Sequence, residues 1–420
     1  MLLVVHSKLM KMWRHSSIQQ VSSSRAPMRI VDSEGHRMVS VRQMIANDVH
    51  QSLSKQRVMN YVGWVGHNNL GDEALYAAIK KVFNHYTLVP SNNSLAIKWP
   101  ILLSGITLFG GGTLLPRWPA SVMPNRFNYA YGIGVVDPGF FTYQYGTQAM
   151  ALYELAICKT KRFRFRLIGV RGEKSRRLLE NWGIKSQVVG DPCLLLEPSS
   201  SLKKEENLVA VSVGSSEPYE PVWGKTEDVA KEAAKLCLLL RKEGYNVVLV
   251  PFSDVDVRHV RGISKETGLP VFREFQNVQS LLDFVSRCTV LVGQRLHSMV
   301  LSAAALTPFL PIEYHSKCSE FSESVGFQEY AVRADKATAE ELLRKFRKLV
   351  DNWDSMYNRL RGKVEIYKRQ LSEFAFQILE DIESLPEEKW RPPEPWSMVC
   401  FRALTRFELS VPRYSRLWNR

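Results

Sequence analysis

The chain has 420 residues, which is long for one hydrophobic core and comfortable for two domains of roughly 100–200 residues each. Apolar residues make up 45% and charged residues 23% of it, an ordinary globular composition, and no apolar run approaches the ~18–20 residues that cross a bilayer. The net charge of +14 favours an anionic partner: a phosphorylated substrate, an anionic membrane surface or nucleic acid.

The distribution of basic residues and cysteines narrows this choice. Lys and Arg are spread along the chain, with local density at 159–166, at 171–177 and in the C-terminal tail. No zinc-finger spacing, RNP-like motif or basic region with heptads is present, so we do not expect nucleic acid as the partner. The six cysteines are scattered without a CxxC pair, which is typical of a reducing compartment and of neither a disulfide scaffold nor a zinc site. We therefore expect a cytoplasmic protein without a metal.

The first half of the chain predicts one α/β domain. Residues 1–56 form an N-terminal extension, basic and free of acids at its start, which we expect to be poorly ordered. A domain is predicted over 57–198, because strand patterns there alternate with helical ones and glycines follow the strands. The predicted strands are 57–64, 106–111, 166–170 and 186–189, and the predicted helices are 72–83 and 175–182.

The same pattern restarts after a charged, Ser-containing linker at 197–207. A second domain of the same type is predicted over 207–337, followed by a charged helical extension at 338–385 and a basic aromatic tail at 386–420. Its predicted strands are 207–214, 246–251, 289–293 and 308–314, and its predicted helices are 226–243, 280–288 and 294–306. Together the two series predict an α/β protein with two parallel sheets.

Two glycine-containing loops follow predicted strands. In GHNNLGDEA (66–74), small residues let a ligand approach the backbone, and the free N–H groups of the helix start attract anions. The alternative to a ligand-binding role is that Asp72 serves only as the N-cap of the following helix. Three glycines at 110–112 indicate a second such loop, for which a tight strand-to-helix turn is the alternative.

Charged side chains occupy the carboxyl ends of several predicted strands. Arg171 directly follows one strand, and Arg295 and His297 follow another. An arginine there suits a bound carboxylate or phosphate, which its planar fork holds through two hydrogen bonds, although a structural salt bridge is the alternative. His297 is a candidate general acid, kept protonated by the charge of the substrate, or else a buried hydrogen-bonded histidine.

Further polar residues follow the neighbouring strands. Asp191 lies in a GDP turn, and Glu313, Tyr314 and Lys317 lie in IEYHSK. A carboxylate facing the two arginines would serve as the base that activates an acceptor hydroxyl. Asp191 as a turn cap and Lys317 as a surface residue are the simpler interpretations.

Six motifs occur in a fixed order between residues 58 and 326: GHNNLGDEA, LFGGGTLLP, GVRGEKSRRLLENWGI, VVGDPCLLL, VGQRLHSMVLSAAALTPFLPI and EYHSK. As an ordered set they resemble the polysaccharide pyruvyl transferase family, and the RLH triplet is the most diagnostic. The resemblance implies two Rossmann-like domains in a GT-B-like arrangement. It also implies phosphoenolpyruvate as donor, a glycan or lipid-linked saccharide as acceptor, a ketal product and no cofactor.

The resemblance also implies roles for the singled-out residues. Arg171, Arg295 and His297 would bind the donor, with His297 catalytic, and the base would be Asp191, Asp72 or Glu313. The expected substrate-binding set is Arg171, Arg295, Leu296, Asn69, Gly71, Gly111, Gly112, Glu313, Tyr314 and Lys317. The segment 131–141 departs from the family, because Asp-Pro stands where a glycine-rich loop ending in Gly-Pro is expected.

Two hypotheses remain open beside this assignment. A GT-B glycosyltransferase that uses a nucleotide sugar would share the fold and the arginines, and Glu313 would then meet the ribose hydroxyls. The basic tail is a candidate for peripheral contact with the inner face of a membrane.

Overall fold

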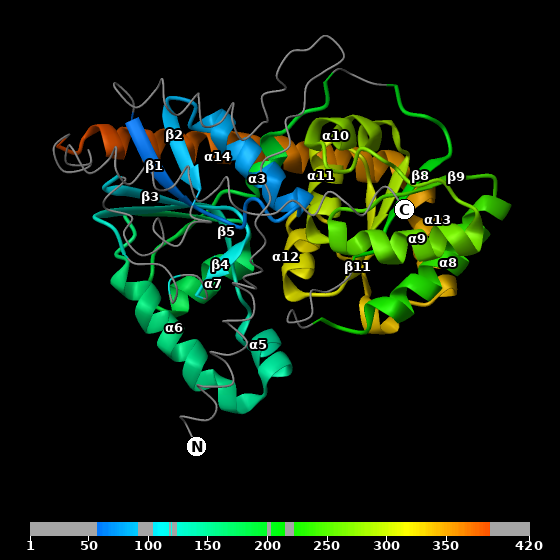
Figure 1. Cartoon of the computed structure of the whole chain (residues 1–420), viewed down its shortest axis with the longest axis horizontal. Helices are drawn as coiled ribbons and strands as arrows, with labels where there is room; N and C mark the ends of the chain where they lie inside the picture. Colours follow the sequence, from blue (N-terminus) through cyan, green and yellow to red (C-terminus); the bar gives the residue numbers. More distant parts are fainter. Residues whose placement is uncertain are drawn as a thin grey trace, which may run out of the picture. The chain divides into compact units, whose positions relative to one another are not determined.

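The computed structural model describes residues 57–90, 104–116, 119, 124–199, 203–214 and 222–386 (Figure 1). These residues belong to one compact unit of the chain. The expected N-terminal extension at 1–56, and all of the basic tail except residue 386, lie outside the described residues. No described helix combines the length and the apolarity that a bilayer crossing requires.

The first sheet is parallel and is built from residues 57–188. Its strands run in the order β2-β1-β3-β5-β6-β7, and the short β4 pairs with β5. The strands are β1 (Arg57–Val62), β2 (Tyr86–Pro90), β3 (Ile106–Gly110), β4 (Thr113–Leu115), β5 (Phe127–Val135), β6 (Leu167–Val170) and β7 (Gln187–Val188). The helices are α3 (Leu70–Val82), α5 (Pro138–Tyr145), α6 (Met150–Arg162) and α7 (Glu173–Asn181). β3 is buried along its whole length, as expected for a strand covered on both faces.

The second sheet is also parallel, in the order β12-β11-β10-β8-β9. Its strands are β8 (Leu208–Ser212), β9 (Asn246–Leu249), β10 (Val290–Gly293), β11 (Phe309–Glu313) and β12 (Val332–Arg333). The helices are α8 (Thr226–Lys242), α9 (Val257–Thr267), α10 (Val278–Arg287), α11 (Leu296–Ala304), α12 (Ser316–Ser324) and α13 (Ala339–Asp351), with a 3₁₀ turn, η5, at Asp254–Asp256.

Both sheets reverse their strand order at the first strand. β1 lies between β2 and β3, and β8 lies between β9 and β10. In open parallel sheets a ligand binds at such a reversal, beyond the carboxyl ends of the strands. The loops at these points are β1–α3, the glycines after β3, and the segment from Gln294 to His297 after β10. The topology therefore brings the motifs singled out in the sequence to the positions where a ligand is expected.

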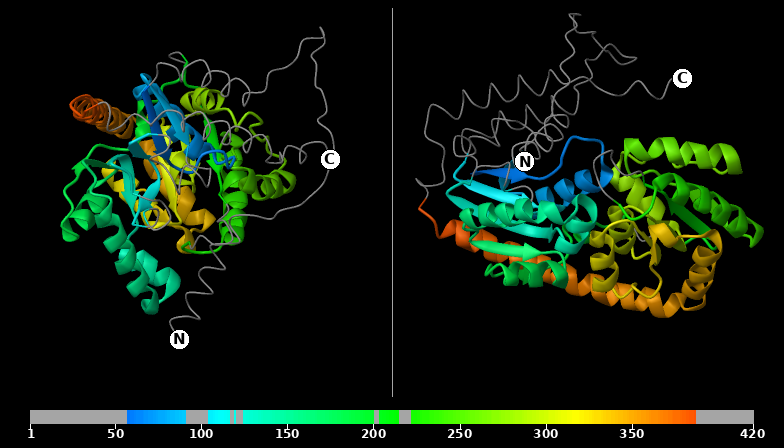
Figure 2. Two further views of the ribbon diagram at one scale, coloured as in Figure 1. Left: turned by 60° about the vertical axis from the view of Figure 1, so that its left-hand side comes forward. Right: turned by 90° about the horizontal axis from the view of Figure 1, so that it is seen from below.

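A long helix, α14 (Trp353–Glu383), runs along both halves (Figure 2). Toward its end Asp381 accepts a hydrogen bond from Tyr129 Oη at 2.6 Å, in the first sheet. At its start Trp353 Nε1 donates to Thr289 O at 2.8 Å, beside the second sheet. The buried Phe374 lies so close to Gly169 of β6 that a side chain there would overlap its ring. The same helix therefore contacts both halves.

Most predicted elements are confirmed, with ends shifted by a few residues. The helical region expected from residue 338 contains α13 and α14. The sequence patterns did not predict four strands and four helices, which are β2, β4, β5, β12, α5, α6, α9 and α12. Residues 131–141, taken there for a departure from a glycine-rich loop, instead form the end of β5 and the start of α5, where the Asp137 side chain caps the helix by accepting from Phe140 N at 2.7 Å.

Candidate active site

The loop between β1 and α3 connects the two halves. Asn68 Nδ2 donates to Asp254 Oδ2 at 2.7 Å, and Leu70 N donates to Phe252 O at 3.0 Å. The N-cap of α3 is Asn69, whose Oδ1 accepts from Gly71 N at 3.2 Å. The alternative in which Asp72 caps this helix is wrong, because Asp72 lies in the first turn, where its charge suits the helix dipole.

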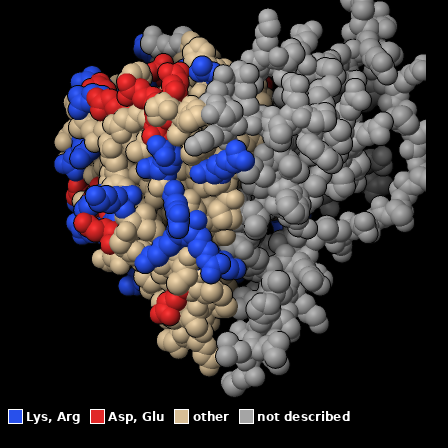
Figure 3. Space-filling view, turned by 90° about the vertical axis from the view of Figure 1, so that its left-hand side faces the viewer, with Lys and Arg blue, Asp and Glu red and all other residues tan. Residues whose placement is uncertain are grey.

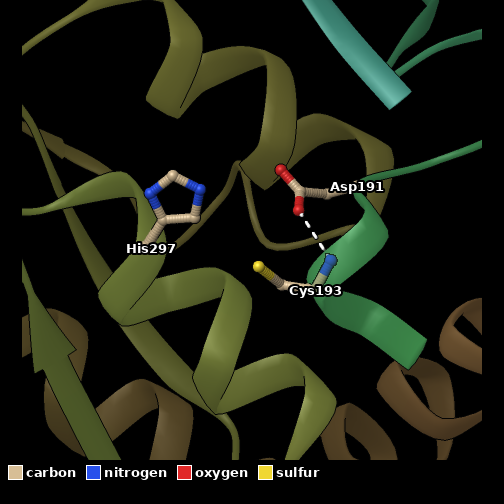
Figure 4. Close-up of side chains that lie close together, drawn as sticks. All are labelled: Asp191, Cys193 and His297. Carbon is tan, nitrogen blue, oxygen red and sulfur yellow. Dashed lines mark hydrogen bonds between the residues drawn. The ribbon is translucent and has the colours of Figure 1, made fainter. Parts of the chain in front are cut away.

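His297 lies where the two halves meet. It is the second residue of α11, and its imidazole packs directly against Gly71, where any Cβ would overlap the ring. The Nε2 atom is buried and has no hydrogen-bond partner. Figure 4 shows the ring facing Asp191 and Cys193, and one ligand atom of each of the three residues lies within 4.8 Å of the others. Two distant segments thus form one small polar centre.

Arg171 is buried beside this centre with incomplete hydrogen bonding. It is 1% exposed, and its Nη1 lies 3.7 Å from Asp191 Oδ2. Nη2 lies 3.5 Å from Glu320 Oε2 and 3.4 Å from Thr113 Oγ1. All three contacts are long, and Nε and Nη1 have no hydrogen-bond partner. The guanidinium is ion-paired, yet it retains donors for another anion.

Arg295 makes a much tighter ion pair. Its Nη2 donates to Asp256 Oδ1 at 2.6 Å, and its Nε lies 3.1 and 3.2 Å from the two carboxylate oxygens. Asp256 is fully buried and also accepts from Phe252 N at 3.1 Å. The structural salt bridge considered as an alternative therefore exists here, and it fixes the arginine at the start of α11.

The remaining residues of the expected substrate-binding set differ in whether they border the centre around His297. Lys317 is close enough for its charge to act on the imidazole, and its Nζ lies 5.0 Å from the centre of the Tyr314 ring. A Cβ on Gly112 would lie 4.0 Å from Asp72 Oδ1, so the second glycine loop borders the start of α3. Glu313 accepts a hydrogen bond from Ser319 Oγ at 2.7 Å, and no described contact connects it to His297. Leu296 is buried at the start of α11, and Gly111 packs against Leu75.

Burial and nearby positive charges control the ionisation of the centre. Burial and the positive charges of Arg171, Lys317 and Arg295 lower the pKa of His297 to about 3, so the imidazole is neutral at pH 7. Burial raises the pKa of Asp191, and the charge of Arg171 opposes this rise. Two of these cations are paired with buried carboxylates, but Arg171 keeps two buried donor atoms without a hydrogen-bond partner. These donors favour a bound anion, which would also favour protonation of the histidine.

Asp191, Cys193 and His297 are close enough to one another to hold a metal ion. Two features oppose that use. The Arg171 guanidinium lies 3.7 Å from Asp191 and would repel a cation, and burial raises the pKa of the Cys193 thiol well above its ordinary value. A thiol must lose its proton to become a good ligand. The cluster therefore suits an anion better than a divalent cation.

Two buried carboxylates, Asp256 and Glu320, were not among the site residues predicted from the sequence. Glu320 Oε1 accepts from Ser175 N at 2.8 Å, so α12 of one half binds the start of α7 in the other. Asp256 follows β9 and its loop, so the strand-end reasoning used for Arg171 could have found it. Glu320 lies inside a helix, where only the tertiary structure shows what it contacts.

The sequence profile of one family, described as polysaccharide pyruvyl transferase, matches residues 69–316, more than half of the chain. The chain belongs to the polysaccharide pyruvyl transferase family. The match begins at the cap of α3 and includes Arg171, Asp191, Arg295 and His297. No curated protein matches the chain.

Solved structures with a similar fold include two described as UDP-GlcNAc 2-epimerases. The UDP-GlcNAc 2-epimerase from Neisseria meningitidis, bound to UDP-GlcNAc, has a TM-score of 0.50 and 9% identity, covering 78% of this chain and 100% of its own. A putative UDP-N-acetylglucosamine 2-epimerase from Listeria monocytogenes has a TM-score of 0.48 and 11% identity, covering 78% and 96%. This chain has two Rossmann-like domains in a GT-B-like arrangement.

Proposed function

We propose that the protein transfers pyruvate from phosphoenolpyruvate to a sugar of a glycan or lipid-linked saccharide as a ketal and releases phosphate. The observation that carries this proposal is the pair of buried Arg171 donor atoms that have no hydrogen-bond partner, in a centre where the charges of Arg171 and Lys317 also act on His297. Phosphoenolpyruvate presents a phosphate and a carboxylate on one carbon, so two anionic groups can meet these donors at once. The family assignment supports the same reaction class.

The reaction needs an acid, a base and a stabilised oxocarbenium-like centre. His297 donates its proton to the methylene carbon of phosphoenolpyruvate, and C2 becomes electrophilic. One sugar hydroxyl adds to C2 and loses its proton to a base, the C2–O bond to phosphate breaks, and a second hydroxyl closes the ketal. Of the two hydroxyl protons, one restores the acid and the other leaves with phosphate.

Burial distinguishes the two carboxylates near His297. The Asp191 side chain is wholly buried, accepts from Cys193 N at 3.0 Å and faces Arg171, so it holds the arginine. Asp72 is partly exposed on the first turn of α3, next to the residue that contacts the imidazole. A base must reach an acceptor hydroxyl that arrives from solvent. We therefore assign the base to Asp72 and a positioning role to Asp191.

Calorimetric titration of phosphoenolpyruvate, pyruvate, phosphate and UDP tests the proposal. The wild type should bind phosphoenolpyruvate more tightly than pyruvate or phosphate, because only this ligand has both anionic groups. Arg171→Gln should weaken that binding at least about tenfold, as expected for a lost charged hydrogen bond. The matched control, Arg177→Gln, removes an exposed arginine of α7 and should change affinity by less than about twofold. Binding of UDP without binding of phosphoenolpyruvate would contradict the proposal and favour a nucleotide-sugar enzyme.

A further inference from the structure

Helix α6 exposes an apolar stripe to solvent. Ala151, Leu155 and Cys158 are exposed and follow the i, i+4, i+7 spacing of one helix face, and Leu155 is 52% exposed. The exposed Glu154, the one acidic residue of α6, lies at the edge of this face. Only two residues of this helix, Tyr153 and Thr160, are buried. A surface helix ordinarily turns its polar side to water, so the exposed Leu155 and its small apolar neighbours form a face suited to contact with an apolar partner.

The stripe leads into a group of cations. Lys161, Arg162 and Arg164 are exposed, and Arg162 continues the i, i+4, i+7, i+11 series of the stripe. None of the three has an acidic partner among the described residues. Figure 3 shows Lys and Arg gathered on this side of the molecule, next to a stretch with few charges.

The segment after α6, residues 163–165, keeps Lys161, Arg162 and Arg164 exposed to solvent. Phe163 and Phe165 pack edge-on against Phe109, with ring centres 5.4 and 5.1 Å away, so the residues between and beside them face solvent. Arg164 has a φ of 45°, a conformation that favours glycine or asparagine. The chain therefore places an arginine where a smaller residue would be less strained, which is typical of functional positions.

We propose that the α6 surface, formed by Ala151, Leu155, Cys158, Lys161, Arg162 and Arg164, binds an anionic lipid bilayer. A bilayer offers phosphate groups and an apolar layer together, and helices that lie in its interface combine an apolar face with Lys and Arg. A nucleic acid would use the cations and leave the apolar stripe unmatched. Helix α6 follows α5 in the chain, and the Phe140 ring centre of α5 lies 3.9 Å from that of His315, two residues before Lys317.

Binding of the full-length protein to vesicles tests this surface. We would compare phosphatidylglycerol–phosphatidylcholine vesicles, phosphatidylcholine vesicles and a DNA duplex. The triple change Lys161→Glu, Arg162→Glu and Arg164→Glu should lower partitioning onto the anionic vesicles by about 100-fold, since each basic residue near such a surface contributes roughly fivefold. Leu155→Ser should lower it about fivefold by removing part of the apolar contact.

A charge-matched control separates this surface from the net charge of the protein. Lys242→Glu, Lys265→Glu and Arg273→Glu change three exposed residues of the second half, and this triple should reduce partitioning less than about threefold. An equal loss in both triples, or binding to vesicles that neither triple changes, would overturn the proposal. So would a Leu155→Ser variant that binds vesicles as the wild type does, because a purely ionic contact would equally suit DNA or an acidic protein. Far-UV circular dichroism establishes that each variant is folded.

Discussion

At the scale of single residues, close approach to glycine sets the geometry of the site. Gly71 lies in helix α3, where alanine would ordinarily be favoured by about 1 kcal/mol. An added Cβ would overlap the His297 imidazole, and a Cβ on Gly214 would come within 2.6 Å of Arg295 Nε. At Gly71 the backbone therefore gives up helix stability so that the two halves can meet at His297, and at Gly214 the missing side chain leaves room for Arg295 within the second half.

Gly71→Ala should displace His297 and lower the rate of phosphate release from phosphoenolpyruvate in the presence of acceptor by about 100-fold or more, the usual effect of an ångström-scale misplacement. The control is Gly262→Ala in α9, where nothing lies within 4 Å of the added carbon. That change should leave the rate unaltered and raise stability by about 0.5–1 kcal/mol. A fully active Gly71→Ala variant would contradict the assigned contact.

His297 also predicts a pH dependence of stability. Its pKa is about 3 in the folded protein and near its ordinary value of 6.5 in the unfolded chain. Between these values the unfolded chain binds more protons, so acidification favours unfolding, by at most about 1.4 kcal/mol per pH unit from this group. Denaturant unfolding between pH 7 and 4 should show a shallower loss of stability for His297→Gln than for the wild type. Parallel curves would show that this histidine titrates normally.

How much of the site the sequence could predict depends on the kind of residue. Arg171, Asp191 and His297 follow strands, so the rule that ligands gather at the ends of parallel strands finds them without a structure. Glu320 could not be found this way, because its role comes from contact between α12 and α7, which are distant in the chain. The pairing of Arg295 with Asp256 was likewise left open, since sequence alone does not separate a salt bridge from an anion site.

At the scale of elements, the turn η5 holds Arg295 in place through Asp256. Asp256→Ala would leave a buried guanidinium without its counter-ion, which should cost about 3–5 kcal/mol of unfolding free energy. Asp335→Ala, which removes the exposed ion pair with Arg333, is the control and should cost less than about 1 kcal/mol. Equal losses in the two variants, measured by urea unfolding, would show that the Arg295 pair is no more important than a surface pair.

The elements also show where pattern reasoning failed. β5 was missed because its sequence, FNYAYGIGV, contains two glycines and an asparagine that ordinarily indicate loops. Gly132 has a φ of 64° at an irregularity in the pairing of β5 with β6, and Pro192 of the GDP turn occupies the space that a side chain there would need. Tertiary packing thus overrides local propensity at a strand that borders Arg171.

At the scale of the whole molecule, α14 contacts both halves, so we expect them to unfold together. Phe374 is buried against β6, whereas Phe376, two residues later, is 60% exposed. Phe374→Ala should lower the unfolding free energy by about 3–5 kcal/mol, and Phe376→Ala by less than about 0.5 kcal/mol. A single thermal transition in the wild type, shifted downward as a whole by Phe374→Ala, is the expected calorimetric result. Two separate transitions would show that the halves unfold independently.

The measurement that tests the central claim most directly is the ionisation of His297 with and without phosphoenolpyruvate. Proteins labelled with ¹³C at histidine Cε1 would be titrated by NMR, with the His297 signal assigned from its loss in His297→Gln. In the free protein the ring should stay neutral down to about pH 3, because burial and three cations oppose its charge. Bound phosphoenolpyruvate should raise this pKa toward neutrality, while UDP leaves it unchanged. A histidine that does not respond to phosphoenolpyruvate would contradict its assignment as the acid of pyruvyl transfer.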